Sequence, residues 1–241
     1  MNIQIRTINL EKRFGSLRAI HNLNINTGLE WECLGILGKN GAGKTTLLRI
    51  LVGLLQSSEG CVEIKINGRT WSHVGPRIAT YIAEQSNLIN SITGRQYLQL
   101  YDAMNRLVGI ERQGDLYNEL IERFSLNGEL TKLVAQMSKG TKRKLEVVAA
   151  VSSQVDLVIT DELTEGLDIP SRIVLEMAIK NMAKSGKRFI VSSHDLSFVT
   201  SVCDSIIIID NGKCVDDFHV SEGGSNIKER VASAFNLTSC D

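Results

Sequence analysis

A glycine-rich loop between two apolar segments constrains the fold of this chain more than any other feature of its sequence. Residues 38–46 read GKNGAGKTT, directly after the apolar run 33–37 and directly before the largely apolar run 47–51. Its glycines allow a tight turn that brings backbone N–H groups against an anionic oxygen, and a following helix points its positive dipole end at the same place. The order of strand, loop and helix therefore predicts a phosphate-binding P-loop in an α/β fold.

This loop supplies most of the candidate nucleotide-binding residues. Lys44 offers a point charge to β- and γ-phosphates, and Thr45 offers a hydroxyl to Mg²⁺. A glycine-rich turn with an exposed lysine is the alternative, and the apolar segments on both sides argue against it. The residues assigned to phosphate binding in the loop are Gly38, Asn40, Gly41, Ala42, Gly43, Lys44, Thr45 and Thr46.

Composition narrows the class of protein. The chain has 241 residues, 43% of them hydrophobic, and its 27 Lys and Arg balance 27 Asp and Glu, so no global attraction to nucleic acid or to an anionic membrane is expected. The most apolar stretches are too short to span a bilayer, which predicts a cytosolic chain. Five cysteines lack the CxxC spacing of a metal site and receive no catalytic or metal role.

The periodicity of apolar residues divides the chain into three regions. Residues 1–92 show short strand patterns, and residues 155–220 alternate between strand and helix as in a parallel sheet. The intervening residues 93–154 carry apolar side chains at helical spacing, which predicts a helical insertion. We expect one domain over residues 1–241, with a β-rich α/β core, a helical subdomain and a C-terminal tail over residues 221–241.

Four landmarks accompany the P-loop along the chain. An apolar strand pattern ends in two carboxylates, Asp161 and Glu162, and the next core strand is followed by His194. Ser138 precedes a helix pattern as a plausible N-cap, and Gln85 follows the strand pattern 78–83. A P-loop alone is compatible with kinases, GTPases and many ATPases. The order of these landmarks along the chain is needed to distinguish between these classes of protein.

In this order the motifs resemble those of the ATP-binding subunit of an ABC transporter, over essentially the whole chain. The resemblance implies a P-loop NTPase fold: a RecA-like α/β core, an N-terminal antiparallel β subdomain and an inserted α-helical subdomain. Matching segments are residues 38–46 (Walker A), Gln85 (Q-loop), residues 138–141 (signature), residues 157–162 (Walker B), residues 166–168 (D-loop) and His194 (switch histidine). Phe14 matches the aromatic that stacks on adenine, although a single phenylalanine is more often a core residue.

The resemblance also implies ATP and Mg²⁺ as cofactors and assigns roles to the matching residues. Glu162, His194, Gln85 and Lys44 are the implied catalytic residues, and Thr45, Gln85 and Asp161 the implied Mg²⁺ ligands. Phe14, Ser138, Gly140 and Asp168 join the loop residues in binding ATP. Ser138 would act on the ATP of a second subunit, because the helical insertion separates it from its own P-loop.

Some positions depart from the common family pattern. The signature reads Ser-Lys-Gly, with Lys139 in place of a glycine, and this form resembles the ABC-2-type exporters of peptides, antibiotics, lipids or polysaccharides. Leu163 and Glu165 replace a usual proline and serine, and an added carboxylate near a γ-phosphate would oppose the nucleotide's charge unless it points away. The basic residues over 139–144 either ease the approach of nucleotide or form a solvated helix face.

The expected function is that of an energy-coupling ATPase docked on separate transmembrane permease subunits at the cytoplasmic face of the membrane. We expect it to bind no nucleic acid. Its partners would be a second ABC ATPase subunit, identical or different, and a permease contacting the junction that Gln85 and residues 86–92 form with the helical insertion. One alternative is a regulatory module that binds ATP without turnover. Another is a soluble ABC ATPase acting on nucleic acid or ribosomes, which usually carries two cassettes or a long coiled-coil insertion.

Overall fold

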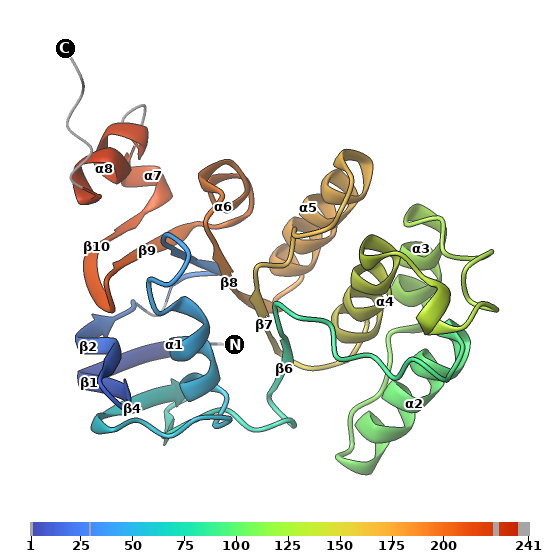
Figure 1. Ribbon diagram of the computed structural model, residues 1–241, viewed down its shortest axis with the longest axis horizontal. Helices are drawn as coiled ribbons and strands as arrows, with labels where there is room; N and C mark the ends of the chain where they lie inside the picture. The colour runs from blue at the N-terminus through green and yellow to red at the C-terminus, as the bar shows by residue number, and fades with distance from the viewer. Residues whose placement is uncertain (1, 29, 224–226, 236–241) are drawn as a thin grey trace.

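The computed structural model describes residues 2–28, 30–223 and 227–235, and two sheets with flanking helices make up its architecture (Figure 1). The strands are β1 (Ile3–Phe14), β2 (Leu17–Asn26), β3 (Cys33–Leu37), β4 (Glu59–Ile66), β5 (Arg69–Trp71), β6 (Ala79–Ile82), β7 (Leu157–Asp161), β8 (Arg188–Ser193), β9 (Ser205–Asp210) and β10 (Lys213–His219). The helices are α1 (Lys44–Leu51), α2 (Gly94–Leu107), α3 (Gly114–Arg123), α4 (Lys139–Val151), α5 (Ile169–Lys184), α6 (Leu196–Val202), α7 (Val220–Gly223) and α8 (Ile227–Ala234), with a 3₁₀ turn at Val134–Gln136.

The larger sheet has six strands in the order β10-β9-β3-β8-β7-β6, and all neighbours pair in parallel except β10 with β9. Every residue of β3 and β7 is buried, which explains their continuous apolar sequences. Because β3, β8 and β7 are adjacent and parallel, the loops after their carboxyl ends emerge at one edge of the sheet. The P-loop, His194 and the two carboxylates therefore meet there.

The second sheet is antiparallel, in the order β2-β1-β4-β5. It shares one hydrophobic core with α1 and one face of the larger sheet, including Ile5 on β1, Leu48 on α1 and Ile190 on β8. Gly15 and Ser16 form the turn of the hairpin that joins β1 to β2. This packing carries the end of β1 toward the P-loop.

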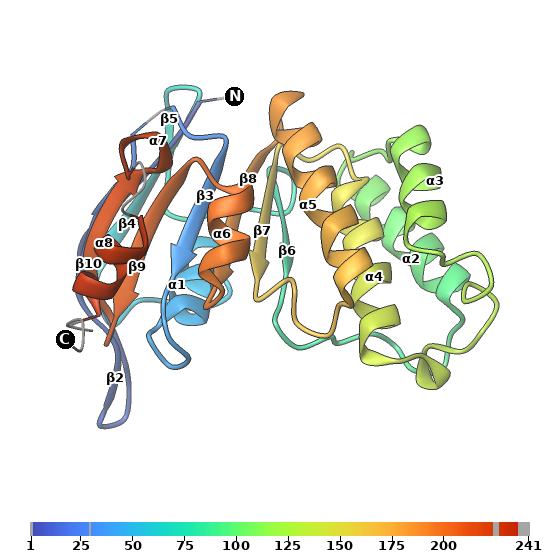
Figure 2. The same cartoon turned by 90° about the horizontal axis from the view of Figure 1, so that it is seen from above.

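Three helices lie beyond β6 and β7, on the opposite side of these strands from α1, in both Figure 1 and Figure 2. Helix α2 begins with a capping box, in which the Thr93 hydroxyl accepts from the Gln96 N–H (3.3 Å) and the Gln96 side chain accepts from the Thr93 N–H (2.9 Å). Leu98, Leu120 and Leu145 connect α2, α3 and α4 in one core. No helix among the described residues is long and apolar enough to cross a membrane.

Some predicted elements differ at their ends. The helix expected after the glycine-rich loop is α1, which ends at Leu51, where a turn containing Gly53 follows. Within the region expected to alternate between strand and helix, α5 begins at Ile169, because Asp168 caps it and Pro170 occupies its first turn. The edge strand β10 and helices α7 and α8 were not predicted. Of the predicted tail over residues 221–241, residues 224–226 and 236–241 lie outside the described residues.

Candidate active site

The P-loop turns from buried strand β3 into α1 through Gly43. Its φ is 104°, and a Cβ there would lie 2.5 Å from the carbonyl oxygen of Ala19, so only glycine fits. Lys44 then starts the helix and bends back into the loop. Its Nζ donates to the carbonyl oxygens of Gly38 (2.8 Å) and Lys39 (3.2 Å). The loop thus holds its own lysine inside the turn where phosphates are expected.

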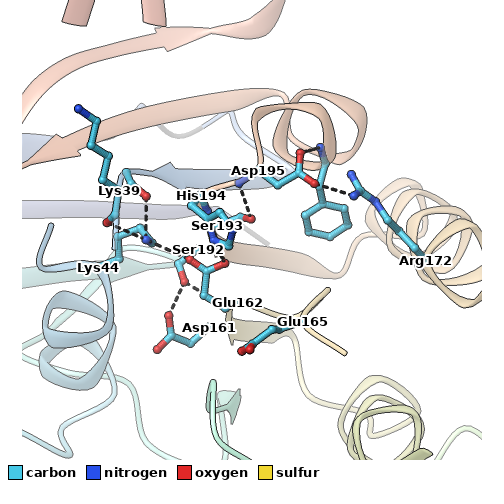
Figure 3. A network of polar contacts seen from close by, with 12 residues as sticks. Lys39, Lys44, Asp161, Glu162, Glu165, Arg172, Ser192, Ser193, His194 and Asp195 are labelled. Atoms are coloured by element: carbon cyan, nitrogen blue, oxygen red, sulfur yellow. Dashed lines mark hydrogen bonds and ion pairs between the residues drawn. The ribbon is translucent and has the colours of Figure 1, made fainter. Parts of the chain in front are cut away.

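Glu162 lies between Lys44 and His194 (Figure 3). Its Oε1 is 3.0 Å from Lys44 Nζ, and its Oε2 is 2.9 Å from His194 Nδ1. The Glu162 side chain is buried, and its backbone has a φ of 47°, a conformation rarely adopted by residues other than glycine. Such conformations are costly and cluster at functional sites, where the surrounding structure maintains them.

Asp161 ends β7 with a fully buried carboxylate. It accepts a hydrogen bond from the Ser192 hydroxyl, and the Tyr81 hydroxyl lies 3.5 Å from its other oxygen. Burial, and after it the charge of Asp161, raises the pKa of Tyr81 to about 12. A buried carboxylate beside a threonine-bearing P-loop is the oxygen donor set that Mg²⁺ prefers, with phosphates completing the coordination.

A cavity of about 450 Å³ opens over the P-loop. Phe14 lines it with 48% of its surface exposed, so this phenylalanine is not a core residue. Lys12 Nζ lies 5.1 Å from the centre of its ring. The cavity is lined by Phe14, Leu17, Arg18, Ala19, residues 40–46, Glu84 and Glu162. It therefore joins an exposed aromatic face to the phosphate-binding loop.

The signature segment lies at the start of α4. Ser138 caps this helix as predicted, its hydroxyl accepting from the Thr141 N–H at 3.1 Å. A Cβ on Gly140 would lie 2.5 Å from the carbonyl oxygen of Gly166, so the signature packs directly on the D-loop. Asp168, at the end of the D-loop, caps α5 through the Ser171 N–H (3.1 Å).

The two unusual residues of these loops pair with one another. Lys139 Nζ donates to Glu165 Oε1 at 2.6 Å, and this hydrogen bond holds the pKa of Glu165 below its usual value. The added carboxylate of the D-loop is thus matched by the added lysine of the signature. Leu163, the other departure, is buried in the hydrophobic core.

The structure brings some predicted site residues together and keeps others apart. Phe14, residues 40–46 and Glu162 share the P-loop cavity, and His194, which contacts Glu162, lines a neighbouring cavity with Gly38. Ser138, Gly140 and Asp168 do not line that cavity; they belong to the signature and D-loop surface beside α4 and α5. Gln85 lines a separate cavity of about 310 Å³ next to α2.

Sequence reasoning missed three residues near this site. Arg18 and Glu84 line the P-loop cavity, and Ser192 holds Asp161. Arg18 follows the Phe14 hairpin closely, so the hairpin itself was the available signal. Ser192 offered none, because its contact depends on the register between β7 and β8, where it pairs with Asp161.

Comparisons with known proteins identify the family of the chain. A profile described as ABC transporter matches residues 21–165, more than half of the chain. The chain belongs to the ABC transporter family. It is 34% identical over 208 residues to the ABC transporter ATP-binding protein YhaQ of Bacillus subtilis, covering 85% of this chain and 67% of that protein. It is 33% identical over 220 residues to the bacitracin transport ATP-binding protein BcrA of Bacillus licheniformis, covering 90% and 70%.

Solved structures of the family have the same fold. An ATP-binding subunit of an ABC transporter superposes with a TM-score of 0.79, at 22% identity and with 98% of this chain and 100% of that chain covered. The predicted fold class, a P-loop ABC ATPase, is therefore confirmed. As an ABC cassette the subunit is an ATP-binding protein and an ATPase.

Proposed function

We propose that the subunit powers an ABC exporter by binding and hydrolysing ATP in a dimer docked on separate membrane subunits. The observation that carries the proposal is the separation of two half-sites. Helix α1, which follows the P-loop, lies on one side of β6 and β7, and the signature helix α4 lies on the other (Figure 2). Ser138 and Gly140 do not line the P-loop cavity. Because neither half encloses a nucleotide alone, a second subunit is needed to bring a signature to each P-loop.

Hydrolysis requires in-line attack of water on the γ-phosphorus while charge on the phosphate oxygens is neutralised. Lys44 is held within the loop to supply one positive charge there. Glu162 would accept the proton of the attacking water, and His194, in contact with it, would orient that carboxylate and the γ-phosphate. Phe14, exposed in the P-loop cavity, would stack on the adenine ring.

Thr45, Asp161 and Gln85 are the residues we assign to Mg²⁺. Bound Mg²⁺ would neutralise charge on the phosphate oxygens. The buried carboxylate of Asp161 fits this role directly, since Ser192 and Tyr81 contact it without adding a competing cation. Gln85 fits only after the loop around it moves, because it lines the neighbouring cavity.

The membrane subunit would contact the cavity that contains Gln85. Its lining includes the apolar side chain of Leu88 and the rings of Tyr97 and Tyr101, each of which ends in a polar hydroxyl. Such a concave, partly apolar surface between the core and the helical subdomain suits an inserted helix of a permease. This position would place the subunit on the cytoplasmic face of a membrane.

The signature form Ser138-Lys139-Gly140 and the similarity to BcrA, a bacitracin transport protein by name, support export of a peptide, antibiotic or lipid-type cargo. The cargo itself would be bound by the membrane subunits. A subunit that only senses nucleotide, or one that acts on nucleic acid or ribosomes, would lack the permease partner.

The test is co-expression with a polytopic membrane protein encoded beside its gene, followed by purification in detergent. We expect the two to co-purify and the complex to hydrolyse ATP faster than the isolated subunit. ATP binding without measurable hydrolysis, alone and in the complex, would favour the regulatory alternative. Co-purification with ribosomes or nucleic acid in place of a membrane protein would favour the third function.

A further inference from the structure

A buried arginine on α4 binds the backbone next to Gln85. The Arg143 side chain is 1% exposed, and its Nη1 donates to the Ala83 carbonyl oxygen at 2.7 Å while Nη2 donates to that of Glu84. Burying a guanidinium is costly unless hydrogen bonds compensate for lost water. Here the compensation comes from the segment that leads into Gln85, so this segment and α4 depend on each other's position.

Glu146 completes the contact from the same face of α4. Its Oε2 lies 3.2 Å from Arg143 Nη1 and accepts a hydrogen bond from the Ser86 hydroxyl at 2.7 Å. Helix α4 therefore holds residues on both sides of Gln85, while Gln85 itself remains exposed. We call Arg143 and Glu146 the Q-loop clamp.

The clamp lies on the helix that begins at the signature. Arg143 is five residues after Ser138, about 7.5 Å along the helix axis. Both residues belong to one uninterrupted element, the capping serine and the first turns of α4, so a displacement of the helix at Arg143 would also move its N-terminal end. A shift of the backbone beside Gln85 therefore moves the capping serine of α4 as well.

Arg143 differs from its basic neighbours. Lys139 extends to Glu165 with most of its side chain exposed, and the hydrogen bond from Lys142 to Asn90 is long, at 3.4 Å. Neither of these lysines is buried, and neither contacts the backbone next to Gln85. Apolar residues such as Leu145 and Val148 already hold α4 in the core. Helix α4 is thus anchored by its apolar residues, and the hydrogen bonds of the buried Arg143 guanidinium go to the backbone before Gln85.

We propose that Arg143 and Glu146 are positioning residues that couple the place of Gln85 to that of Ser138 within one subunit. Nucleotide in the P-loop cavity would then alter the signature end of the same chain before any partner binds. The inference rests on the proposed function only in assigning Gln85 and Ser138 to nucleotide sites. The contacts of the clamp are independent of that assignment.

Hydrogen exchange of the nucleotide-free subunit tests the clamp itself. Arg143→Gln should speed exchange of the backbone amides over residues 84–88 about tenfold, while Lys142→Gln, which removes a charge one residue away and whose contact is with Asn90 outside this segment, should leave it unchanged. Circular dichroism verifies that each variant is folded. Because Arg143→Gln removes a buried group, Glu146→Gln and Ser86→Ala provide milder versions, for which we expect smaller increases in the same segment. Unchanged exchange in all three folded variants would overturn the proposal.

The coupling is tested with the nonhydrolysable ATP analogue AMP-PNP and Mg²⁺, at a concentration where size-exclusion chromatography shows only monomer. In the parental subunit, exchange over residues 138–143 should change on binding. Arg143→Gln should bind the analogue with a Kd within about threefold of the parental value and lose that change. Binding without any change in the parental subunit, or an equal change in the variant, would refute the coupling. Failure of the parental subunit to bind the analogue would instead contradict the proposed function, and the nucleotide-free comparison would still decide the clamp.

Discussion

Lys44 Nζ lies 3.0 Å from Glu162 Oε1, and both side chains are buried. Two opposite charges removed from water at this distance compensate each other, so either one alone would be costly to bury. A γ-phosphate that binds Lys44 would take over this compensation and leave Glu162 able to accept a proton from water. The pair thus relates occupancy of the P-loop to the availability of the base.

Glu162→Gln should keep ATP binding and lose turnover by about 10²- to 10⁴-fold, because the amide retains the shape but cannot accept the proton. Steady-state phosphate release and equilibrium ATP binding measure the two effects, and the ATP-bound variant should elute as a dimer. Glu122→Gln, on the exposed side of α3, is the control and should behave as the parental subunit. Hydrolysis at the parental rate in Glu162→Gln would exclude Glu162 as the base.

Ser138→Arg should abolish hydrolysis and leave ATP binding to the monomer intact, because Ser138 does not line its own P-loop cavity. Lys44→Ala should abolish hydrolysis by weakening binding. Mixed dimers of the two variants contain one intact pair of half-sites and should regain activity. If mixed dimers form, as judged by two affinity tags, and show no activity, the shared-site arrangement is wrong for a homodimer.

Exchanging the charges of Lys139 and Glu165 should show that they act as a pair. Lys139→Glu alone places two carboxylates together and should lower the free energy of unfolding, by no more than about 1 kcal/mol because both side chains are substantially exposed. Adding Glu165→Lys should restore it. Urea unfolding of the two single variants and the double variant measures the interaction, and losses that simply add in the double variant would show that the two do not interact.

Leu88→Arg should leave the isolated subunit folded and its ATP binding nearly unchanged, because Leu88 lines the cavity beside Gln85 and not the P-loop cavity. Association with the membrane subunit should weaken, since an unpaired guanidinium in an interface costs several kcal/mol. Leu107→Arg introduces the same group on an exposed side chain at the end of α2, outside residues 86–92 and outside this cavity, and serves as the control. A folded Leu88→Arg subunit that co-purifies normally and supports full transport would contradict the assignment.

Lys187 predicts a pH dependence of stability. Its Nζ donates to the carbonyl oxygens of Val151 (2.9 Å) and Ser153 (2.6 Å) at the end of α4, and burial lowers its pKa to about 8, with the Asp156 charge opposing this. Between this value and its ordinary pKa of 10.5, the unfolded chain holds more protons than the folded one. Stability contributed by this group therefore rises with pH in that range.

Relative to Lys187→Met, the parental subunit should gain about 1 kcal/mol in free energy of unfolding from pH 7.5 to pH 9. Urea unfolding at both pH values provides the measurement, and Lys184→Met, an exposed lysine on α5, should show no such difference from the parental protein. Equal slopes for the parental subunit and Lys187→Met would show that Lys187 has an ordinary pKa.

Local features of this protein were predictable from its sequence, and contacts between distant segments were not. The P-loop and the helix cap at Ser138 each depend on residues that are close together in the sequence, so a sequence pattern reveals them. Strand β10 was missed because its edge position leaves Phe218 as its one buried residue, with no apolar alternation to reveal it. The burial of Arg143 was hidden in the same way, since in sequence it is one of several adjacent basic residues.

The placement of the P-loop and the signature on opposite sides of β6 and β7 has a genetic consequence. In a dimer of unlike chains, each ATP would be enclosed by parts from two genes. A replacement beside Glu162, such as Leu163, would then change the hydrolysis of the ATP held by this chain's own P-loop. The Lys139–Glu165 pair would change the hydrolysis of the ATP held by the P-loop of the second subunit. Substitutions at Leu163 and at the Lys139–Glu165 pair, all in one gene, could therefore affect the two ATP sites differently. The two sites would then hydrolyse ATP at unequal rates although the second gene is unchanged.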